Sequence, residues 1–93
     1  MTDDNATYDV EWASPALRAL DRLPEKVATA VIGFVYTTLA VSPRRAGRPL
    51  RFQLEGLHSA RRGDYRIIYG IDDRHATVVI DTVAHRSDIY RRR

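Results

Sequence analysis

The sequence contains no cysteine, which excludes disulfide bonds and thiolate metal sites. Its three histidines, His58, His75 and His85, are too scattered along the chain to suggest a zinc cluster. It has no glycine-rich nucleotide loop, no HExxH motif and no clear pair of catalytic carboxylates. The sequence therefore offers no site for a metal ion or another cofactor.

Long apolar runs are also missing, and none approaches the roughly 20 residues needed to cross a bilayer. The first five residues, Met1 to Asn5, are polar and acidic, whereas a secretory signal is basic and then apolar. With 93 residues, 44% of them hydrophobic, the chain predicts one domain spanning residues 1–93. We expect residues 1–7 to form a disordered N-terminal tail and the protein to be cytoplasmic.

Lysine is nearly absent, with a single lysine beside fourteen arginines. Residues 1–43 carry three basic and six acidic side chains, a net charge of −3, whereas residues 44–93 carry twelve arginines and six acids, a net charge of +6. Genome base composition would account for arginine in place of lysine, but not for the concentration of positive charge in one half. The second half is therefore the candidate contact surface for an anionic polymer, and nucleic acid is the polymer we expect.

The first half predicts a short strand followed by two helices. Residues 8–12 alternate apolar and polar side chains, as a half-buried strand does. Ser14 and Pro15 are typical of the N-cap and first position of a helix. Pro24 ends that helix and starts a second one, whose wide apolar face continues to about Val41. Together the two segments predict an antiparallel helical hairpin.

The second half predicts three strands, which cover about residues 54–62, 65–72 and 76–84. Gly63 and Asp64 supply the turn between the first two strands. In the middle strand, Ile67 and Arg66 belong to opposite faces. The order strand, helix, helix, strand, strand, strand predicts an α+β fold with a small, mainly antiparallel sheet. The helical hairpin packs on one face of this sheet, and the other face is left for function.

A hairpin at this turn would bring Arg61 and Arg66 close together in space. Guanidinium groups gathered on a small sheet form a site for an anion, above all a phosphate. The alternative is that these arginines form surface ion pairs with Asp64 or Asp81, which would stabilise the fold little. The residues alone leave both interpretations open.

A second candidate group lies in the C-terminal segment. His85 directly follows the last predicted strand, so we expect it at the sheet edge beside the hairpin, and its unperturbed pKa lies near neutrality. Tyr90 carries a phenol that can stack on a base or donate a proton. In the alternative interpretation, the Tyr90 ring packs on the core and His85 is merely exposed.

Three segments carry a wider pattern: Leu54–Leu57, Arg61–Tyr69, and His85-Arg86 followed by Tyr90. Together they resemble the RelE branch of the RelE/ParE superfamily, the toxins of bacterial type II toxin–antitoxin systems. The resemblance covers nearly the whole chain. It implies an endoribonuclease that cuts messenger RNA in the ribosomal A site and so inhibits translation. In that reaction the ribose 2′-oxygen attacks the adjacent phosphorus, the 5′-oxygen leaves, and no metal is needed.

The resemblance also implies roles for individual residues. Arg61 and Arg66 would stabilise the phosphorane, with Arg66 nearest the leaving oxygen, and Tyr90 would stack on the base or position the 2′-hydroxyl. RelE-type enzymes often carry a basic residue two positions before Arg61, but this chain has Ser59 there. His85 is then the best substitute as general base. Further nucleic-acid contacts are implied for Arg51, Arg62 and Arg86.

Two other functions are compatible with the same fold, since fold does not fix function. A ParE-type toxin binds DNA gyrase and cleaves nothing itself, so it needs no phosphate-transfer site. A catalytically weak member would retain only antitoxin binding, with Ser59 as the mark of the loss. Every one of these functions implies a cognate RelB-like antitoxin, an acidic and partly disordered chain that folds onto the helical hairpin and the sheet edge.

Overall fold

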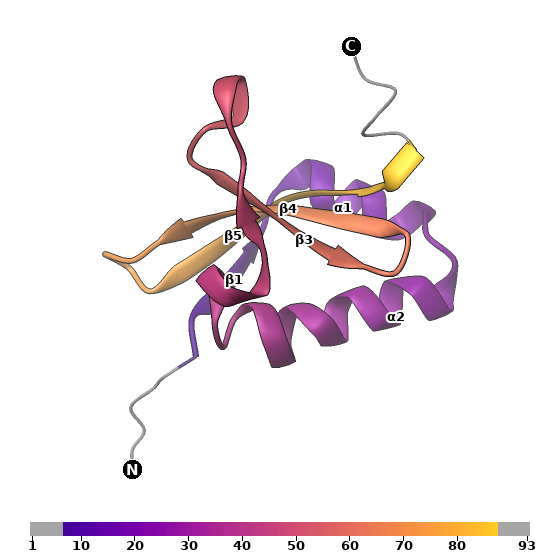
Figure 1. Ribbon diagram of the computed structural model, residues 1–93. Helices are drawn as coiled ribbons and strands as arrows, with labels where there is room; N and C mark the ends of the chain where they lie inside the picture. The colour runs from indigo at the N-terminus through magenta and orange to yellow at the C-terminus, as the bar shows by residue number, and fades with distance from the viewer. Residues whose placement is uncertain (1–6, 88–93) are drawn as a thin grey trace.

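The computed structural model describes residues 7–87 as a twisted sheet flanked by helices (Figure 1). The expected tail 1–7, apart from Thr7, and the candidate Tyr90 lie outside the described residues. The sheet has five strands in the order β1-β5-β4-β3-β2. In chain order the elements are β1 (Asp9–Trp12), α1 (Ser14–Arg22), α2 (Glu25–Phe34), the π-helical η1 (Val35–Leu39), α3 (Pro43–Ala46), β2 (Arg48–Pro49), the 3₁₀ turn η2 (Phe52–Leu54), β3 (Leu57–Arg62), β4 (Tyr65–Asp72) and β5 (Thr77–His85).

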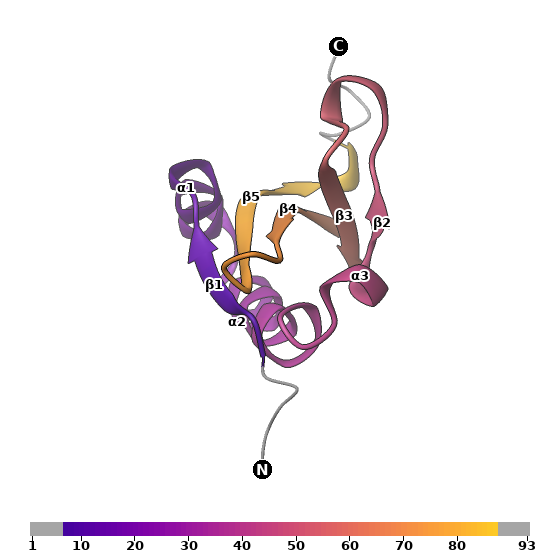
Figure 2. The ribbon, with the colours of Figure 1, turned by 90° about the vertical axis from the view of Figure 1, so that its left-hand side faces the viewer.

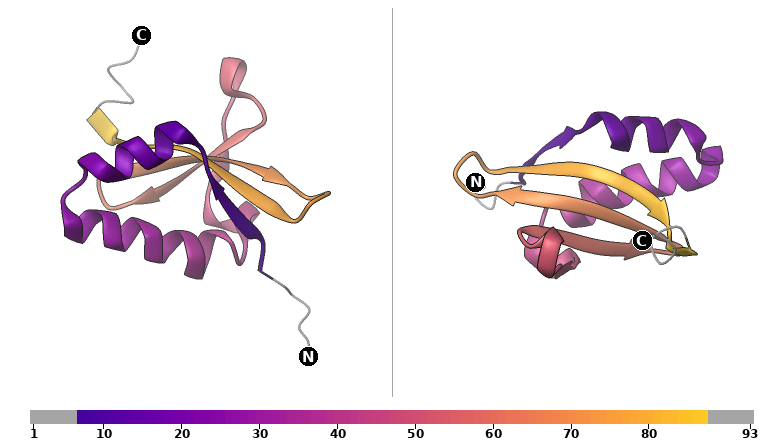
Figure 3. Two further views of the ribbon diagram at one scale, coloured as in Figure 1. Left: turned by 180° about the vertical axis from the view of Figure 1, so that it is seen from behind. Right: turned by 90° about the horizontal axis from the view of Figure 1, so that it is seen from above.

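This arrangement confirms the predicted α+β fold. β1 runs parallel to β5, whereas the β2–β3, β3–β4 and β4–β5 pairs are antiparallel, so the sheet is mixed with mainly antiparallel pairing. The two helices form the predicted hairpin and lie together on one side of the sheet (Figures 2 and 3). The segment between β2 and β3 projects from the other side, away from α2 (Figure 1).

The helices follow the predicted pattern with one difference at their start. Ala13, not Ser14, is the N-cap of α1, because the Ala13 carbonyl accepts the first helical hydrogen bonds. The predicted Ser14 cap is therefore wrong, and Pro15 lies in the first turn, where its missing N–H costs no hydrogen bond. Pro24 separates the helices as predicted, and α2 continues through η1, which ends at Leu39, two residues before the predicted Val41. None of the helices within residues 7–87 is long and apolar enough to span a membrane.

The core lies between the helical hairpin and the face of the sheet toward it. Ile67 and Tyr69 of β4 are fully buried there, and a buried side chain of this size contributes about 1.5–3 kcal/mol to folding. The Tyr69 hydroxyl donates a hydrogen bond to the Pro43 carbonyl at 2.7 Å, which satisfies its buried polar atom. Burial raises the pKa of Tyr69 to about 12, so its phenol stays neutral. The rest of the core consists of Ala16, Val31, Val35, Leu39, Ala60, Val78, Ile80 and Val83.

The strands differ from their predicted bounds mainly around the β2–β3 segment. β4 spans residues 65–72 as predicted, and β5 is shifted by one residue at each end. β3 begins at Leu57 rather than at residue 54, because η2 and Gly56, with its φ of +98°, interrupt the extended backbone. The two-residue strand β2 was not predicted. Its length and the Pro49 that ends it give none of the alternation by which a strand is recognised.

A β-bulge in β5 changes which side chains face the helices. Ile68 pairs with Thr82 and Tyr69 with Ile80, so Asp81 is an extra residue outside the ladder. Before the bulge the even-numbered Ile80 is buried against the helices, and after it the odd-numbered Val83 is buried there. The bulge therefore reverses the alternation of β5, and every side chain beyond Asp81 lies on the face opposite to the one that a regular strand would give it.

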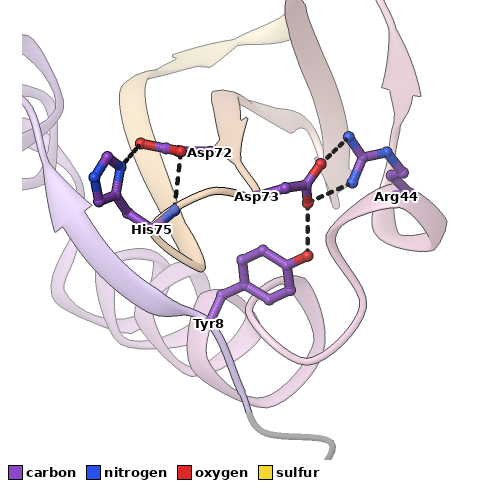
Figure 4. Close-up of polar contacts among 5 residues, drawn as sticks. All are labelled: Tyr8, Arg44, Asp72, Asp73 and His75. Carbon is purple, nitrogen blue, oxygen red and sulfur yellow. Dashed lines mark hydrogen bonds and ion pairs between the residues drawn. The ribbon is translucent and has the colours of Figure 1, made fainter.

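Polar contacts close the end of the sheet where the chain enters it (Figure 4). Asp73, in the turn between β4 and β5, accepts a hydrogen bond from the Tyr8 hydroxyl at 2.8 Å. The same carboxylate forms a bidentate ion pair with Arg44 of α3, at 3.0 and 2.9 Å. In the same turn Asp72 accepts hydrogen bonds from the backbone and ring nitrogens of His75. These contacts join the start of β1, α3 and the β4–β5 turn.

Candidate nucleic-acid interface

The β3–β4 hairpin places Arg61 directly opposite Arg66. The turn has two residues, and of these only Gly63 has a positive φ, +63°, as in a type II′ turn with glycine first. This turn fixes the register, in which Arg61 and Arg66 are partners. Partners in an antiparallel pair point to the same face with Cβ atoms about 4.5–5.5 Å apart. The predicted proximity of the two arginines is confirmed.

The two arginines lie on the face of the sheet that the helices leave open. The neighbouring pair, Ala60 and Ile67, is buried against the helices, so Arg61 and Arg66 belong to the opposite face. Arg48 of β2 joins them, because its partner Ser59 shares a face with Arg61. The open face thus carries arginines on three adjacent strands. We call Arg48, Arg61 and Arg66 the arginine row.

The alternative interpretation was that Arg61 forms a surface ion pair with Asp64 or Asp81. Within residues 7–87 no such ion pair is formed. The Arg61 side chain is exposed, and neither Asp64 nor Asp81 forms a salt bridge with it. The salt bridges of the described residues instead join Arg44 to Asp73 and His75 to Asp72. Like charges directly opposite in a sheet repel each other, so the arginine row costs the fold stability. An anion bound between the guanidinium groups would remove that cost.

Ser59 lies on the same open face, beside the arginine row. It is only 8% exposed, and its Oγ is buried with no hydrogen-bond partner among the described residues. This is the position at which the sequence pattern led us to expect a basic residue. Gly47 allows the close approach of chain there, because a Cβ at Gly47 would collide with the Ser59 carbonyl oxygen. The absence of a side chain at Gly47 therefore lets the chain just before β2 pack closely on β3 at Ser59.

His85 ends β5 beside the hairpin, as predicted, but on the other face from the arginine row. Its ladder partner is Tyr65, and the two rings meet edge to face with centroids 5.2 Å apart. A cavity of about 570 Å³ separates this end of β5 from α1, and its lining includes His85, Arg18 and Arg22. The bulge at Asp81 produces this placement, because regular alternation would have turned His85 toward Arg66.

The contacts of His85 select one form of its neutral ring. The backbone N–H of Ser87 donates to Nδ1 at 3.2 Å, and the Ser87 hydroxyl lies 2.9 Å from the same atom. Because Nδ1 accepts a hydrogen bond, the neutral ring carries its hydrogen on Nε2. In this form His85 presents a donor, not a lone pair, to its surroundings.

The other three predicted contact residues lie at separate places. Arg62 is on the helix side, with its guanidinium carbon 5.9 Å from the centre of the Phe34 ring, a cation–π contact. Arg86 is exposed next to the hairpin, where its backbone N–H donates to the Asp64 carbonyl at 2.8 Å. Arg51 is exposed in the segment between β2 and β3, at the far end of β3 from the hairpin. Arg62 follows Arg61 directly but belongs to the opposite face, whereas Arg86 lies beside the hairpin turn.

Sequence reasoning did not single out Arg48 or Phe52. Arg48 joins the arginine row only through the pairing of β2 with β3, and a two-residue strand gives no sequence signal. Phe52 lies in the segment between β2 and β3 and is 87% exposed. Phe52 could have been noticed in the sequence because it directly follows Arg51. It lies in a stretch, residues 43–54, that holds four arginines and no acid.

Comparison with known proteins gives one consistent result. Residues 10–90 match the family described as ParE toxin of type II toxin–antitoxin systems. The chain is 54% identical to Toxin RelE of Mycobacterium tuberculosis over 98% of its own length and 93% of that protein. It is 51% identical to Toxin RelG of the same organism, over 91% of this chain and 98% of that one.

Solved structures agree with these sequence relationships. The toxin–antitoxin complex RelBE2 of Mycobacterium tuberculosis contains a chain that superposes with a TM-score of 0.84 and 47% identity, over 87% of this chain and all of that one. The isolated RelE toxin of E. coli superposes with a TM-score of 0.70 and 23% identity, over 89% and 90% of the two chains. The second similarity concerns the fold alone.

Proposed function

Because the chain belongs to the RelE/ParE superfamily, as a toxin of a type II toxin–antitoxin system, we propose that it cuts messenger RNA held in the ribosomal A site. The paired Arg61 and Arg66 on the open face are the observation that carries the proposal. Two arginine side chains that start from paired positions on one face can both reach a phosphodiester, whose non-bridging oxygens each accept hydrogen bonds. A toxin that only binds a protein has no need of this pair.

The proposed reaction is transfer within the RNA chain. The ribose 2′-hydroxyl loses its proton to solvent water as its oxygen attacks the adjacent phosphorus. The bond from phosphorus to the 5′-oxygen breaks, the 5′-oxygen takes a proton from the site, and the products end in a 2′,3′-cyclic phosphate and a 5′-hydroxyl. Negative charge rises on the non-bridging oxygens as the phosphorane forms. Donors already in place stabilise that charge more than they stabilise the substrate, which is the source of the rate enhancement. Arg61 and Arg66 fill this role, with Arg66 toward the leaving oxygen.

His85 is proposed as the proton-transfer residue of the site. The resemblance implied a base, but the acceptor role of Nδ1 favours a ring that donates from Nε2. The leaving 5′-oxygen needs a proton, which a neutral ring does not give up, so the acid would be the protonated ring, with Nε2 toward the leaving oxygen and Nδ1–H donating to the Ser87 hydroxyl. β1 pairs only with Thr77–Ile80, which leaves the end of β5 as an open edge within the described part of the chain. RNA that reaches both His85 and the arginine row would cross the sheet at this edge.

Three further contacts complete the proposal. Tyr90 is proposed to stack on a base or hold the 2′-hydroxyl, and Arg86, beside the hairpin turn, to hold a flanking phosphate. Arg62 and Arg51 are proposed to hold phosphates farther along the strand. None of these contacts requires a metal ion.

The direct test is cleavage of a defined message on purified ribosomes, with mapping of the new 5′ ends. Cuts confined to the A-site codon are expected for the wild type. Arg61→Ala and Arg66→Ala should each slow cleavage about 10²- to 10³-fold, the usual cost of removing one donor to a developing charge. Arg74→Ala, which removes an exposed arginine from the β4–β5 turn, is the matched control. Intact message with fully active ribosomes would overturn the proposal.

A second candidate function is inhibition of DNA gyrase, which the match to the ParE toxin family favours. Such a toxin would leave messages intact and instead produce broken or relaxed DNA with purified gyrase. Arg61→Ala would then leave toxicity unchanged, since no phosphate is transferred. A catalytically weak, antitoxin-binding member would show neither activity.

A cognate RelB-like antitoxin is the proposed protein partner. The similar mycobacterial chain is known as part of a toxin–antitoxin complex. Exposed arginines on the open face would attract the acidic side chains of such a partner. An antitoxin bound there would compete with RNA phosphates for the same guanidinium groups, and pull-down from cells that express both genes would identify it.

A further inference from the structure

The segment between β2 and β3 presents an aromatic ring to solvent. Phe52 is 87% exposed and Leu54 is 50% exposed, in a segment that projects away from α2 (Figures 1 and 2). We call residues 50–56 the projecting loop. A large apolar side chain gains nothing for the fold when it is this exposed, because the hydrophobic effect rewards only buried area.

Phe52 has an unfavourable backbone conformation, which hydrogen bonds within the projecting loop maintain. Its φ is +59°, in the left-handed region that bulky side chains avoid. Backbone hydrogen bonds from Leu54 to Arg51 at 3.1 Å and from Glu55 to Phe52 at 3.0 Å close the turn, and Leu50 donates to Leu57 at 2.9 Å across its base. An unfavourable backbone conformation that displays an unburied aromatic ring points to function, since neither feature stabilises the fold.

Positive charge precedes Phe52 along the chain, and the single acid of the projecting loop, Glu55, follows it. The stretch from residue 43 to residue 54 holds four arginines and no acid, and all four are exposed. Arg44 is paired with Asp73, whereas Arg45, Arg48 and Arg51 form no ion pair within residues 7–87. Arg48 belongs to the arginine row, so the charge continues from the proposed cleavage site to the base of the projecting loop.

We propose that Phe52 stacks on an unpaired RNA base while Arg48 and Arg51 hold the phosphates beside it. Every base has a π-face, so an exposed ring among arginines is the usual device for gripping single-stranded RNA. The inference rests on the proposed function, because it supplies the RNA. It adds a contact at a distance from the reacting phosphate, at the end of β3 away from the hairpin. A protein partner would be expected to meet an apolar groove, whereas Phe52 projects from the surface.

The test measures binding without cleavage. The probes are a 2′-O-methyl oligonucleotide, which has no attacking hydroxyl, and ribosomes programmed with a message carrying the same modification. Phe52→Ala should weaken binding about tenfold or more, as expected for the loss of one base–aromatic stack. Phe52→Trp should retain binding, and Leu54→Ala, in the same loop, is the control that should bind as the wild type does. Arg51→Gln should lower the salt dependence by about one phosphate contact.

The possible outcomes separate this inference from the proposed function. If Phe52→Ala binds the oligonucleotide more weakly, the base that stacks on Phe52 belongs to the message. If it binds more weakly only to the programmed ribosome, that base belongs to ribosomal RNA. Equal binding of Phe52→Ala and wild type to both probes would overturn the inference, while A-site cleavage by the wild type would keep the proposed function. Loss of antitoxin binding with unchanged RNA binding would make the loop a protein contact instead. No RNA binding by the wild type would overturn both.

Discussion

Arg61 lies directly opposite Arg66 in the β3–β4 ladder, so two positive side chains share one face at adjacent positions. A folded protein gains no stability from this pair, since like charges opposite each other in a sheet are destabilising. The shared face of the two arginines and the repulsion between them are both typical of a binding site for a negatively charged ligand. Function and stability should therefore change in opposite directions when the exposed Arg61 is replaced.

Arg61→Thr is expected to stabilise the fold while it slows cleavage about 10²- to 10³-fold. Removal of one charge ends the repulsion and places a β-branched residue in a strand, a gain of about 0.5 kcal/mol. A gain of this size raises the melting temperature of a domain of this length by roughly 2–4 °C. Calorimetry at low ionic strength measures the shift. Adding Arg66→Thr should give less than the sum of the two single effects, because the repulsion has already been removed. If the stability changes of the two single variants add up exactly in the double variant, the two arginines do not repel each other.

The two β-strand histidines are expected to differ in their effect on cleavage. His85→Gln should slow the reaction about 10²- to 10⁴-fold if its ring transfers a proton. His58→Gln should change cleavage little, because His58 is stacked on Tyr69 at 5.5 Å in the interior edge of the sheet, away from the paired arginines. Single-turnover cleavage on programmed ribosomes compares them. Equal rates for the two variants would remove His85 from the mechanism.

Local patterns in the sequence were enough to predict the fold and the paired arginines. The Gly63-Asp64 turn and the alternation after it place β4 correctly, and the register of a two-residue hairpin then follows from chemistry within eight residues. The face of His85 could not be predicted in this way. It depends on the bulge at Asp81, which forms because Ile80 and Val83 must both face the core. That requirement comes from packing against the helices, not from neighbouring residues.

Acid should destabilise the fold first through His58. Burial lowers the pKa of His58, and the nearby Arg44 charge lowers it further. Since the unfolded chain then binds the proton more readily, stability should fall as the pH drops below about 6.5, the ordinary value for histidine. Urea unfolding at pH 7.5, 6.5 and 5.5 measures this loss. His58→Gln should flatten the dependence in this window, and an unchanged slope in the variant would show that another group is responsible.

A second acid transition should come from Asp73. Hydrogen bonds from Arg44 and Tyr8 lower the pKa of its carboxyl group below the ordinary 3.8. The stabilisation is therefore complete above that value and is lost as the pH falls through the lowered pKa. Asp73→Asn should reduce the pH dependence below pH 4, where Asp72, whose pKa is lowered by its hydrogen bonds from His75, still contributes. The dependence near pH 6 should remain. Because both partners are exposed, salt should weaken the effect, and urea unfolding with and without 0.5 M NaCl checks this.

Two glycines should respond to alanine in opposite ways. A Cβ at Gly47 would collide with the Ser59 carbonyl, so Gly47→Ala should force β2 away from β3 and cost about 1–3 kcal/mol. Gly33 lies in α2 with no atom within 4 Å of its would-be Cβ, so Gly33→Ala should stabilise by about 0.5–1 kcal/mol. Urea unfolding of both variants decides the signs. Because Arg48 follows Gly47 directly, Gly47→Ala should also weaken RNA binding, whereas Gly33→Ala should leave it unchanged. If Gly47→Ala is destabilised but binds RNA normally, Arg48 of β2 does not contribute to RNA binding.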